Sequence, residues 1–138
     1  MESIASGNVF PHFRALAGYK FPPANFVCKA DKSRQAADDV LAVNNTNVSY
    51  FLNVDASTNH PSQTTILSGD RNLELDGKPA GPGLRTISAA HSPSWTSELH
   101  PKGGNLAFAD GHVEIGWTNQ LNDKLREQDA AVSRWVIP

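Results

Sequence analysis

The sequence predicts an α+β fold, with helices near the two ends of the chain and antiparallel strands between them. Apolar residues follow a helical spacing near the N-terminus, they alternate with polar residues in the middle of the chain, and Asp110-Gly111 joins two alternating runs. The chain has 138 residues. We expect one domain over 1–138, because a chain of this length buries about two-thirds of its unfolded surface in a single core.

Composition and charge exclude several classes of protein. Apolar residues make up 39% of the chain, which is typical of globular domains. The chain has 12 Lys and Arg and 14 Asp and Glu, so it is not basic and we expect no nucleic acid among its partners. A lone Cys28 excludes a disulfide scaffold and a Cys-type zinc finger. No run of 18 apolar residues occurs and the N-terminus lacks signal-peptide features, so we expect no membrane insertion.

The first expected element is a short helix over 9–17. Its apolar face consists of Val9, Phe10, Phe13, Leu16 and Ala17. Asn8 or Ser6 would cap this helix, Pro11 is tolerated in its first turn, and Gly18 would end it.

Four weaker or shorter elements are expected next. We predict a strand-like run at 26–28 and a helical turn within 33–43. In 47–54 the even-numbered positions are apolar and the odd ones mostly polar, which predicts a strand with one packed face. Residues 64–68 are its expected antiparallel partner.

The segment 76–101 is predicted to be a long surface loop. It contains five Gly and Pro residues within 77–83 and shows no firm periodicity afterwards. The chain after residue 117 predicts a helix that Thr118 caps and that docks on the sheet. The apolar stripe of this helix is Leu121, Leu125, Val132 and Trp135.

The strongest local pattern is a hairpin over 105–117. Asp110-Gly111 between alternating runs is typical of a two-residue type I′ turn, in which both residues have positive φ. That turn predicts pairs of Phe108 with Val113 and of Leu106 with Ile115, and it puts all four side chains on one face.

Candidate chemistry at this hairpin centres on His100, Asp110 and His112. These residue types bind zinc and other divalent ions, so a metal-dependent enzyme is one interpretation. The structural interpretation, which we favour, makes Asp110 a turn residue and His112 an exposed strand residue. It has His100 hydrogen-bonded to a backbone carbonyl or to Asp110.

A second polar cluster is Asp70-Arg71-Asn72. Adjacent side chains on extended backbone point to opposite sides, so we expect these residues to pin a loop rather than to act on one group. No nucleophile or phosphate-loop motif is present, and no base accompanies Cys28. Three tryptophans could form a sugar-stacking surface, although core positions are the commoner explanation. They are Trp95, Trp117 and Trp135.

His100 is followed by nine residues and then by Asp110-Gly111. This spacing resembles the bacterial prepilin-type proteins named for their H-x9-DG motif, a group similar to type II secretion pseudopilins and type IV pilins. The resemblance extends in order along nearly the whole chain. It covers the blocks 9–16, 26–31, 47–51, 67–73, 104–111 and 134–138.

The resemblance implies a pilin-like head, in which an N-terminal helix packs on an antiparallel sheet with long loops. The implied function is a non-catalytic, soluble head of a filament subunit, with other pilin-like subunits or secreted proteins as partners. The implied location is the cell envelope, at the periplasmic face of the inner membrane where an anchoring helix is present. The chain departs from the family in lacking that apolar helix and the prepilin cleavage motif, and in having Lys29 where the family often has proline after Cys28.

Without the apolar helix, we expect a monomer or a weak dimer. An alternative function is a binding module that recognises a secreted protein or a glycan through 76–101. No cofactor is expected. Some pseudopilin heads bind calcium, for which Asp110, Asp123 and Asp70 would be the first candidate ligands here.

Overall fold

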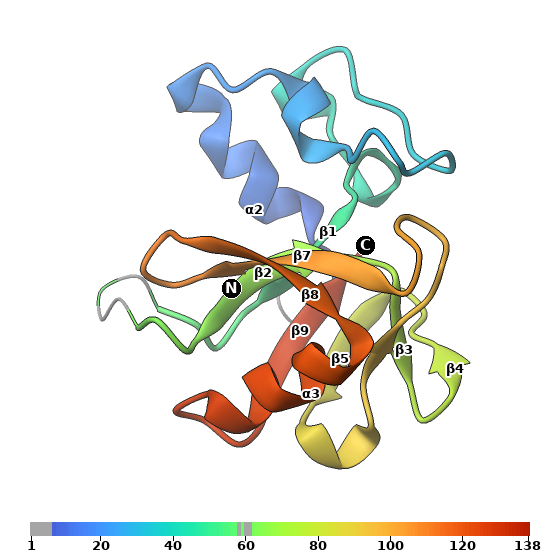
Figure 1. Ribbon diagram of the computed structural model, residues 1–138. Helices are drawn as coiled ribbons and strands as arrows, with labels where there is room; N and C mark the ends of the chain where they lie inside the picture. The colour runs from blue at the N-terminus through green and yellow to red at the C-terminus, as the bar shows by residue number, and fades with distance from the viewer. Residues whose placement is uncertain (1–6, 58, 60–61) are drawn as a thin grey trace.

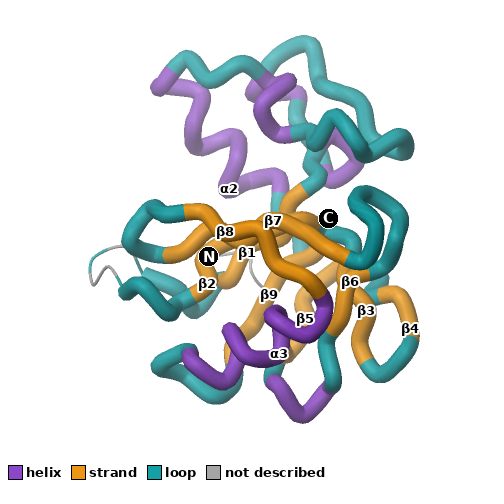
Figure 2. Tube along the Cα trace, viewed as in Figure 1, coloured by secondary structure: helices purple, strands orange, loops and turns teal. Residues whose placement is uncertain are grey.

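The computed structural model describes residues 7–57, 59 and 62–138. A six-stranded antiparallel sheet occupies the middle of the molecule (Figures 1 and 2). Residues 7–49, which we call the N-terminal segment, lie over one face of this sheet, and the C-terminal helix and a small second sheet lie on the other. The expected α+β class is confirmed.

The helices are few and the strands short. The α-helices are α2 (Phe10–Arg14) and α3 (Thr118–Glu127). The 3₁₀ turns are Ala15–Tyr19, Pro23–Phe26, Val40–Ala42, Asn45–Asn47 and Ala89–His91. The strands are β1 (Tyr50–Asn53), β2 (Ile66–Asp70), β3 (Leu73–Leu75), β4 (Lys78–Pro79), β5 (Gly83–Ile87), β6 (Ser94–Trp95), β7 (Gly103–Phe108), β8 (Val113–Trp117) and β9 (Ser133–Ile137).

The order of the strands in the large sheet is β5-β9-β1-β2-β7-β8. The small sheet has the order β4-β3-β6. The last strand along the chain, β9, therefore lies inside the large sheet, whereas β8 is an edge strand.

Two apolar clusters hold the layers together, one on each face of the large sheet. The larger contains Phe51 and Trp135, whose stacked rings have centroids 4.1 Å apart, together with Leu121 and Leu125 of α3. The smaller joins the N-terminal segment to the sheet through Val136 of β9. Both faces of the central strands are thus covered.

The N-terminal helix is present but shorter than expected. It begins at Phe10 with Pro11 in its first turn, as predicted, and continues as a 3₁₀ turn through Tyr19 rather than ending at Gly18. The side chain of Asn45, far along the chain, accepts hydrogen bonds from the first backbone N–H groups, so the expectation that Asn8 caps the helix is wrong. Ser6, the other expected cap, lies outside the described residues.

The expected strand-like run at 26–28 and the helical turn over 33–43 are wrong in large part. Residues 23–26 form a 3₁₀ turn after Pro22, and only Val40–Ala42 is helical in the second range. Asp39 accepts a hydrogen bond from the backbone N–H of Leu41, which is the competition between side chain and backbone that shortens helices.

The strand predicted over 47–54 is β1, which pairs antiparallel with β2 as expected. The even-numbered face packs as expected, but the expectation that the other face is wetter is wrong. Phe51 and Asn53 point into the larger core, whereas Tyr50 and Leu52 pack against the N-terminal segment. The N-terminal segment covers the face that was expected to pack, and the other face packs as well.

The segment 76–101 is not the long surface loop that was predicted. It contains β4, β5 and β6, and β5 pairs with β9 over five residues. Trp95 at its end is only 3% exposed. The segment is therefore held in strands, although most of its residues are partly or fully exposed.

The hairpin joins β7 to β8, but its register differs from the prediction by one residue. Leu106 pairs with Glu114 and Ala107 with Val113, and the Phe108 N–H donates to the carbonyl of His112. Three residues therefore form the loop, and of Asp110 and Gly111 only the glycine has a positive φ, of 97°. The one-residue shift turns Val113 and Ile115 away from Leu106 and Phe108.

The C-terminal helix ends at Glu127, so its predicted apolar stripe is only half correct. Leu121 and Leu125 are buried in the core, as expected. Val132 is 54% exposed, and Trp135 belongs to β9. Thr118 is the first helical residue rather than the cap, and its hydroxyl accepts a hydrogen bond from the N–H of Trp95.

Candidate functional site

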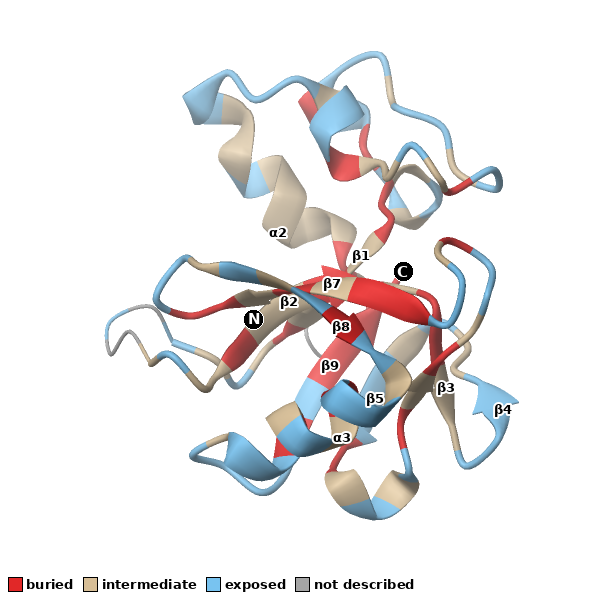
Figure 3. Cartoon of the chain, viewed as in Figure 1, coloured by how far each residue is buried: buried red, intermediate tan, exposed pale blue. Residues whose placement is uncertain are grey.

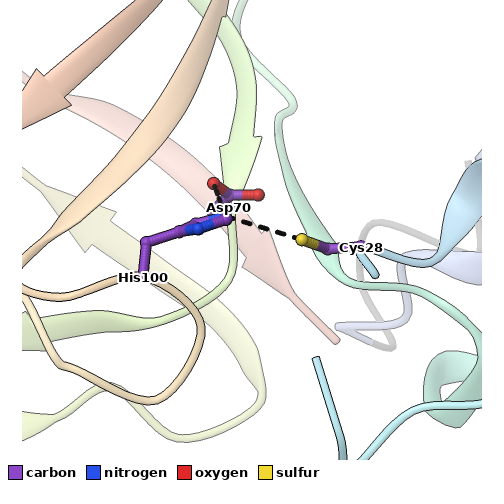
Figure 4. A group of neighbouring side chains, drawn as sticks. All are labelled: Cys28, Asp70 and His100. Carbon is purple, nitrogen blue, oxygen red and sulfur yellow. Dashed lines mark hydrogen bonds and ion pairs between the residues drawn. The ribbon is translucent and has the colours of Figure 1, made fainter. Parts of the chain in front are cut away.

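Three segments that are far apart in the sequence bring Cys28, Asp70 and His100 together (Figure 4). Cys28 follows the 3₁₀ turn at 23–26 in the N-terminal segment, Asp70 is the last residue of β2, and His100 directly precedes β7. A backbone bridge between His100 and Gly103 fixes the entry to β7. The cluster lies between the N-terminal segment and the large sheet.

The ligand atoms of these side chains converge on one point. The Nε2 atom of His100 is 3.5 Å from Sγ of Cys28 and 3.4 Å from Oδ2 of Asp70. One such atom from each residue lies within 4.8 Å of the other two. Asp70 is fully buried, and Cys28 and His100 are partly buried.

Asn105 of β7 holds the Asp70 carboxylate in place. Both the backbone N–H and the side-chain amide of Asn105 donate to Oδ2 of Asp70, at 2.7 and 2.9 Å. No donor among the described residues reaches the buried Oδ1 atom. Burial raises the pKa of Asp70 above its ordinary value, although the hydrogen bonds from Asn105 and the nearby His100 oppose this shift.

Tyr50 of β1 lies beside the same cluster, and its pKa is shifted there. It pairs with Asp70 across β1 and β2. Its pKa is raised to about 12, mainly by burial, with smaller contributions from Cys28, Asp70 and Asp31. Tyr50 is therefore a neutral phenol beside the cluster.

The arrangement is not that of a nucleophilic triad. In a triad the histidine uses one ring nitrogen for the nucleophile and the other for the carboxylate. Here Cys28 and Asp70 both approach the same nitrogen of His100. Because one nitrogen carries one proton or one lone pair, it cannot relay a proton from the thiol to the carboxylate. The set of thiol, imidazole and carboxylate is instead a set that could hold a metal ion.

The predicted cluster of Asp70, Arg71 and Asn72 is split among different partners, in agreement with the expected alternation of side chains. Arg71 makes a two-pronged ion pair with the buried Asp31, at 2.7 and 2.8 Å, and also contacts Glu98. Asn72 donates to the carbonyls of Thr96 and Gly103.

Burial alone would raise the pKa of Asp31, but hydrogen bonds from Arg71, Ser49 and Ser33 outweigh it and hold the pKa well below its ordinary value. This ion pair ties the N-terminal segment to the end of β2. Arg71 and Asn72 therefore lie beside the Cys28 cluster without belonging to it.

The hypothesis that His100, Asp110 and His112 act together is wrong. His100 precedes β7 and Asp110 follows it, and the six residues of β7 separate them by roughly 20 Å. Asp110 instead accepts hydrogen bonds from the backbone and the ring of His112. Hydrogen bonds to Asp110 and Glu114 raise the pKa of His112. The expected hydrogen bond between His100 and Asp110 is likewise absent from the described contacts.

The three expected calcium ligands do not form a site either. Asp110 lies in the hairpin loop, Asp123 pairs with Arg126 on the surface of α3, and Asp70 is buried at the end of β2. Of the three tryptophans, Trp95 and Trp135 are buried and Trp117 is 55% exposed. They form no common stacking surface.

Sequence reasoning missed Cys28 and Tyr50 as neighbours of His100 and Asp70. The alternation in β1 placed Tyr50 on one face of a strand, but nothing in the sequence indicated what covers that face. Cys28 is separated from His100 by 72 positions, and no spacing rule connects a loop cysteine to a histidine at that distance.

Comparisons with protein-family models, with curated proteins and with solved structures give no match to this chain. Among the described residues, no helix has the length and apolar character needed to cross a bilayer.

Proposed function

We propose that the chain is the non-catalytic head of a filament subunit similar to type II secretion pseudopilins, and that it binds a neighbouring subunit through the edge strand β8. The observation that carries this proposal is the apolar face that β8 presents to solvent. In this role the head would lie at the cell envelope, held by an anchoring helix.

The exposed face of β8 consists of alternate residues. Val113, Ile115 and Trp117 are 64%, 72% and 55% exposed (Figure 3). They share one side of the strand because side chains alternate along it. Their neighbour Glu114 points to the other side, where it pairs with Lys124 of α3 at 2.9 Å.

The position of β8 makes this face suited to a protein partner. Among the residues that the structure describes, the strand pairs with β7 on one side and with no strand on its other side. Edge strands of monomeric proteins are usually protected by charged residues or proline, and β8 has neither on its exposed face. An apolar strand at an open edge is typical of sites that accept a strand from another chain.

The arrangement of α2 on the sheet also supports the proposal. Helix α2 and the 3₁₀ turn that follows it pack on the antiparallel sheet through partly buried apolar side chains, Phe13 in the helix and Leu16 in the turn. This is the arrangement that the resemblance to prepilin-type proteins implies for a head domain. No step of the proposed role needs a catalytic group.

A site-specific cross-link tests the proposal in the natural host. The photoreactive residue benzoylphenylalanine replaces Ile115 in the protein expressed from its own gene, and a second variant carries it at Leu41. Leu41 is the matched control, because it is 66% exposed but lies in the N-terminal segment. We expect position 115 to give a cross-linked product that position 41 does not give.

Mass spectrometry of the product then decides between the interpretations. A second copy of this chain, or another subunit with an apolar N-terminal helix, supports the filament role. A secreted protein as the linked partner would contradict the binding of a neighbouring subunit through β8. Equal labelling at both positions would contradict a role for β8.

A further inference from the structure

We infer that Cys28, Asp70 and His100 form a binding site for one Zn²⁺ ion that joins the N-terminal segment to the large sheet. The inference does not rest on the filament role, although Ile115 and Trp117 of the exposed β8 face line a cavity beside His100. Its three ligands come from three separate segments, so an ion bound there would cross-link the two layers.

The spacing of the ligand atoms matches a tetrahedral zinc centre. Zinc bonds of about 2.0–2.3 Å put neighbouring ligand atoms of a tetrahedron about 3.3–3.8 Å apart. The two distances from Nε2 of His100, 3.5 Å to Sγ and 3.4 Å to Oδ2, lie in this range. The distance from Nε2 to Oδ2 is long for a hydrogen bond, and the distance to Sγ is ordinary for one that involves sulfur. Both distances are also ordinary for two ligands of one metal ion.

The Asp70 carboxylate is an independent indication of a ligand. Its side chain is fully buried, and its Oδ1 atom has no donor among the described residues. Asn105 already holds Oδ2 with two hydrogen bonds. Buried carboxylate oxygens are normally paired with a donor or bound to a metal, so Oδ1 is free to bind the ion together with Oδ2, the oxygen that lies 3.4 Å from His100.

The chemistry of the three side chains selects the metal. A thiolate and an imidazole are poor ligands for Ca²⁺ and Mg²⁺, which prefer oxygen, but they are the common ligands of zinc. A thiolate and a carboxylate together also neutralise the charge of a divalent ion, which favours binding at a buried position. Asn105 would orient the carboxylate from outside the coordination sphere, as hydrogen-bonding neighbours of metal ligands usually do.

Three protein ligands leave a fourth position for water. A cavity of about 260 Å³, lined by His100, Gly103 and Asn105 among others, adjoins the cluster. His100 itself is 35% exposed in its side chain, which gives the ion a path of entry. The site is therefore accessible to a metal added to the folded protein.

Titration with Co²⁺, a spectroscopic substitute for Zn²⁺, tests the inference on the purified chain after chelation and under non-thiol reducing conditions. We expect one equivalent to give the visible absorption of tetrahedral cobalt and a thiolate charge-transfer band in the near ultraviolet. Added Zn²⁺ should displace both signals. Cys28→Ser, which keeps the shape of the side chain, should remove the charge-transfer band and weaken binding at least about 100-fold, because even the loss of an outer neighbour costs 10–100-fold.

His100→Gln should weaken binding by a comparable factor, and His112→Gln is the matched control. His112 pairs with carboxylates in the same manner but lies at the hairpin loop. Circular dichroism of each variant separates loss of the site from loss of the fold. The inference is overturned by a wild-type chain without the charge-transfer band, by equal affinity in Cys28→Ser, or by equal losses in His112→Gln. Binding without a band and equal in all variants would indicate an adventitious ion only.

Discussion

At the scale of single residues, position 104 of β7 requires glycine because the ring of Trp95 leaves no space for a side chain. A Cβ atom at position 104 would lie 2.6 to 2.7 Å from three ring carbons of Trp95, which is itself buried in the core. We expect Gly104→Ala to lower the free energy of unfolding by about 1–3 kcal/mol, the usual effect of overpacking. Urea unfolding measures the change.

Gly18 provides the control for this substitution. A Cβ atom there would meet no atom within 4 Å, and its φ is not positive. Gly18→Ala should leave stability unchanged or raise it by about 0.4–1 kcal/mol, because it restricts the unfolded chain. Equal losses at both positions would mean that the contact with Trp95 does not decide the effect.

Residue types predicted two members of the candidate site, but they did not predict the contacts between its members. His100 and Asp70 were selected from the sequence because histidine and aspartate carry chemistry, and both belong to the cluster in the structure. Their partners were chosen wrongly. Neighbours in the sequence, such as Asp110, were preferred for His100, whereas its contacts come from β2 and from the loop at Cys28. Such contacts depend on the packing of layers, about which local patterns carry no information.

At the scale of elements, the hairpin of β7 and β8 shows how one residue in a loop changes a whole face. The Asp-Gly pair predicted the hairpin and its position. It did not distinguish a two-residue loop from a three-residue loop, because both place glycine at a positive φ. The observed loop has one more residue, and the resulting shift exposes Val113 and Ile115 instead of burying them.

Substitutions of Gly111 test the observed conformation of the loop. Its φ of 97° is a conformation that side chains with a Cβ atom rarely adopt, although the space around it is open. We expect Gly111→Val to lower the free energy of unfolding by about 1–2 kcal/mol through backbone strain alone. Gly111→Asn should lose less, since asparagine tolerates positive φ better. Equal losses in the two variants, measured by thermal unfolding, would argue against strain as the cause.

The strands β5 and β6 were missed for a related reason. β5 is Gly-Leu-Arg-Thr-Ile, and its partner β9 lies about 50 residues later. No short turn joins β5 to β9, so no local pattern predicts that they pair. β1, β2 and the hairpin were found because alternation or a turn residue marks each of them. The N-terminal segment was the least predictable part, since the start of α2 is capped by Asn45, a residue far along the chain.

At the scale of the whole molecule, the Asp31–Arg71 pair couples the N-terminal segment to the sheet and makes stability depend on pH. The side chain of Asp31 is fully buried and that of Arg71 is 10% exposed. Asp31→Asn should lower the free energy of unfolding at pH 7 by about 3–5 kcal/mol, the usual effect of removing one partner of a buried pair.

The pH dependence follows from the lowered pKa of Asp31. The folded pKa lies below the unfolded value of about 3.9, so the stabilisation is complete above that value and is lost as the pH falls through the folded pKa. The difference between the wild type and Asp31→Asn should therefore shrink below about pH 4. Asp123→Asn, which removes an exposed pair with Arg126, is the control and should change stability by less than about 1 kcal/mol. A difference that stays constant down to pH 2 would contradict the assignment.

A ribosome synthesises β1 and β5 well before β9, although β9 lies between them in the sheet. Translation at about 5–20 residues per second leaves β1 without this partner for about 4–16 s, while roughly 80 further residues are added. During that time Phe51 lacks the ring of Trp135, and the facing edges of both strands are open. The nascent chain is therefore most exposed to strand pairing with other nascent chains, and to aggregation, before residues 133–137 have left the exit tunnel.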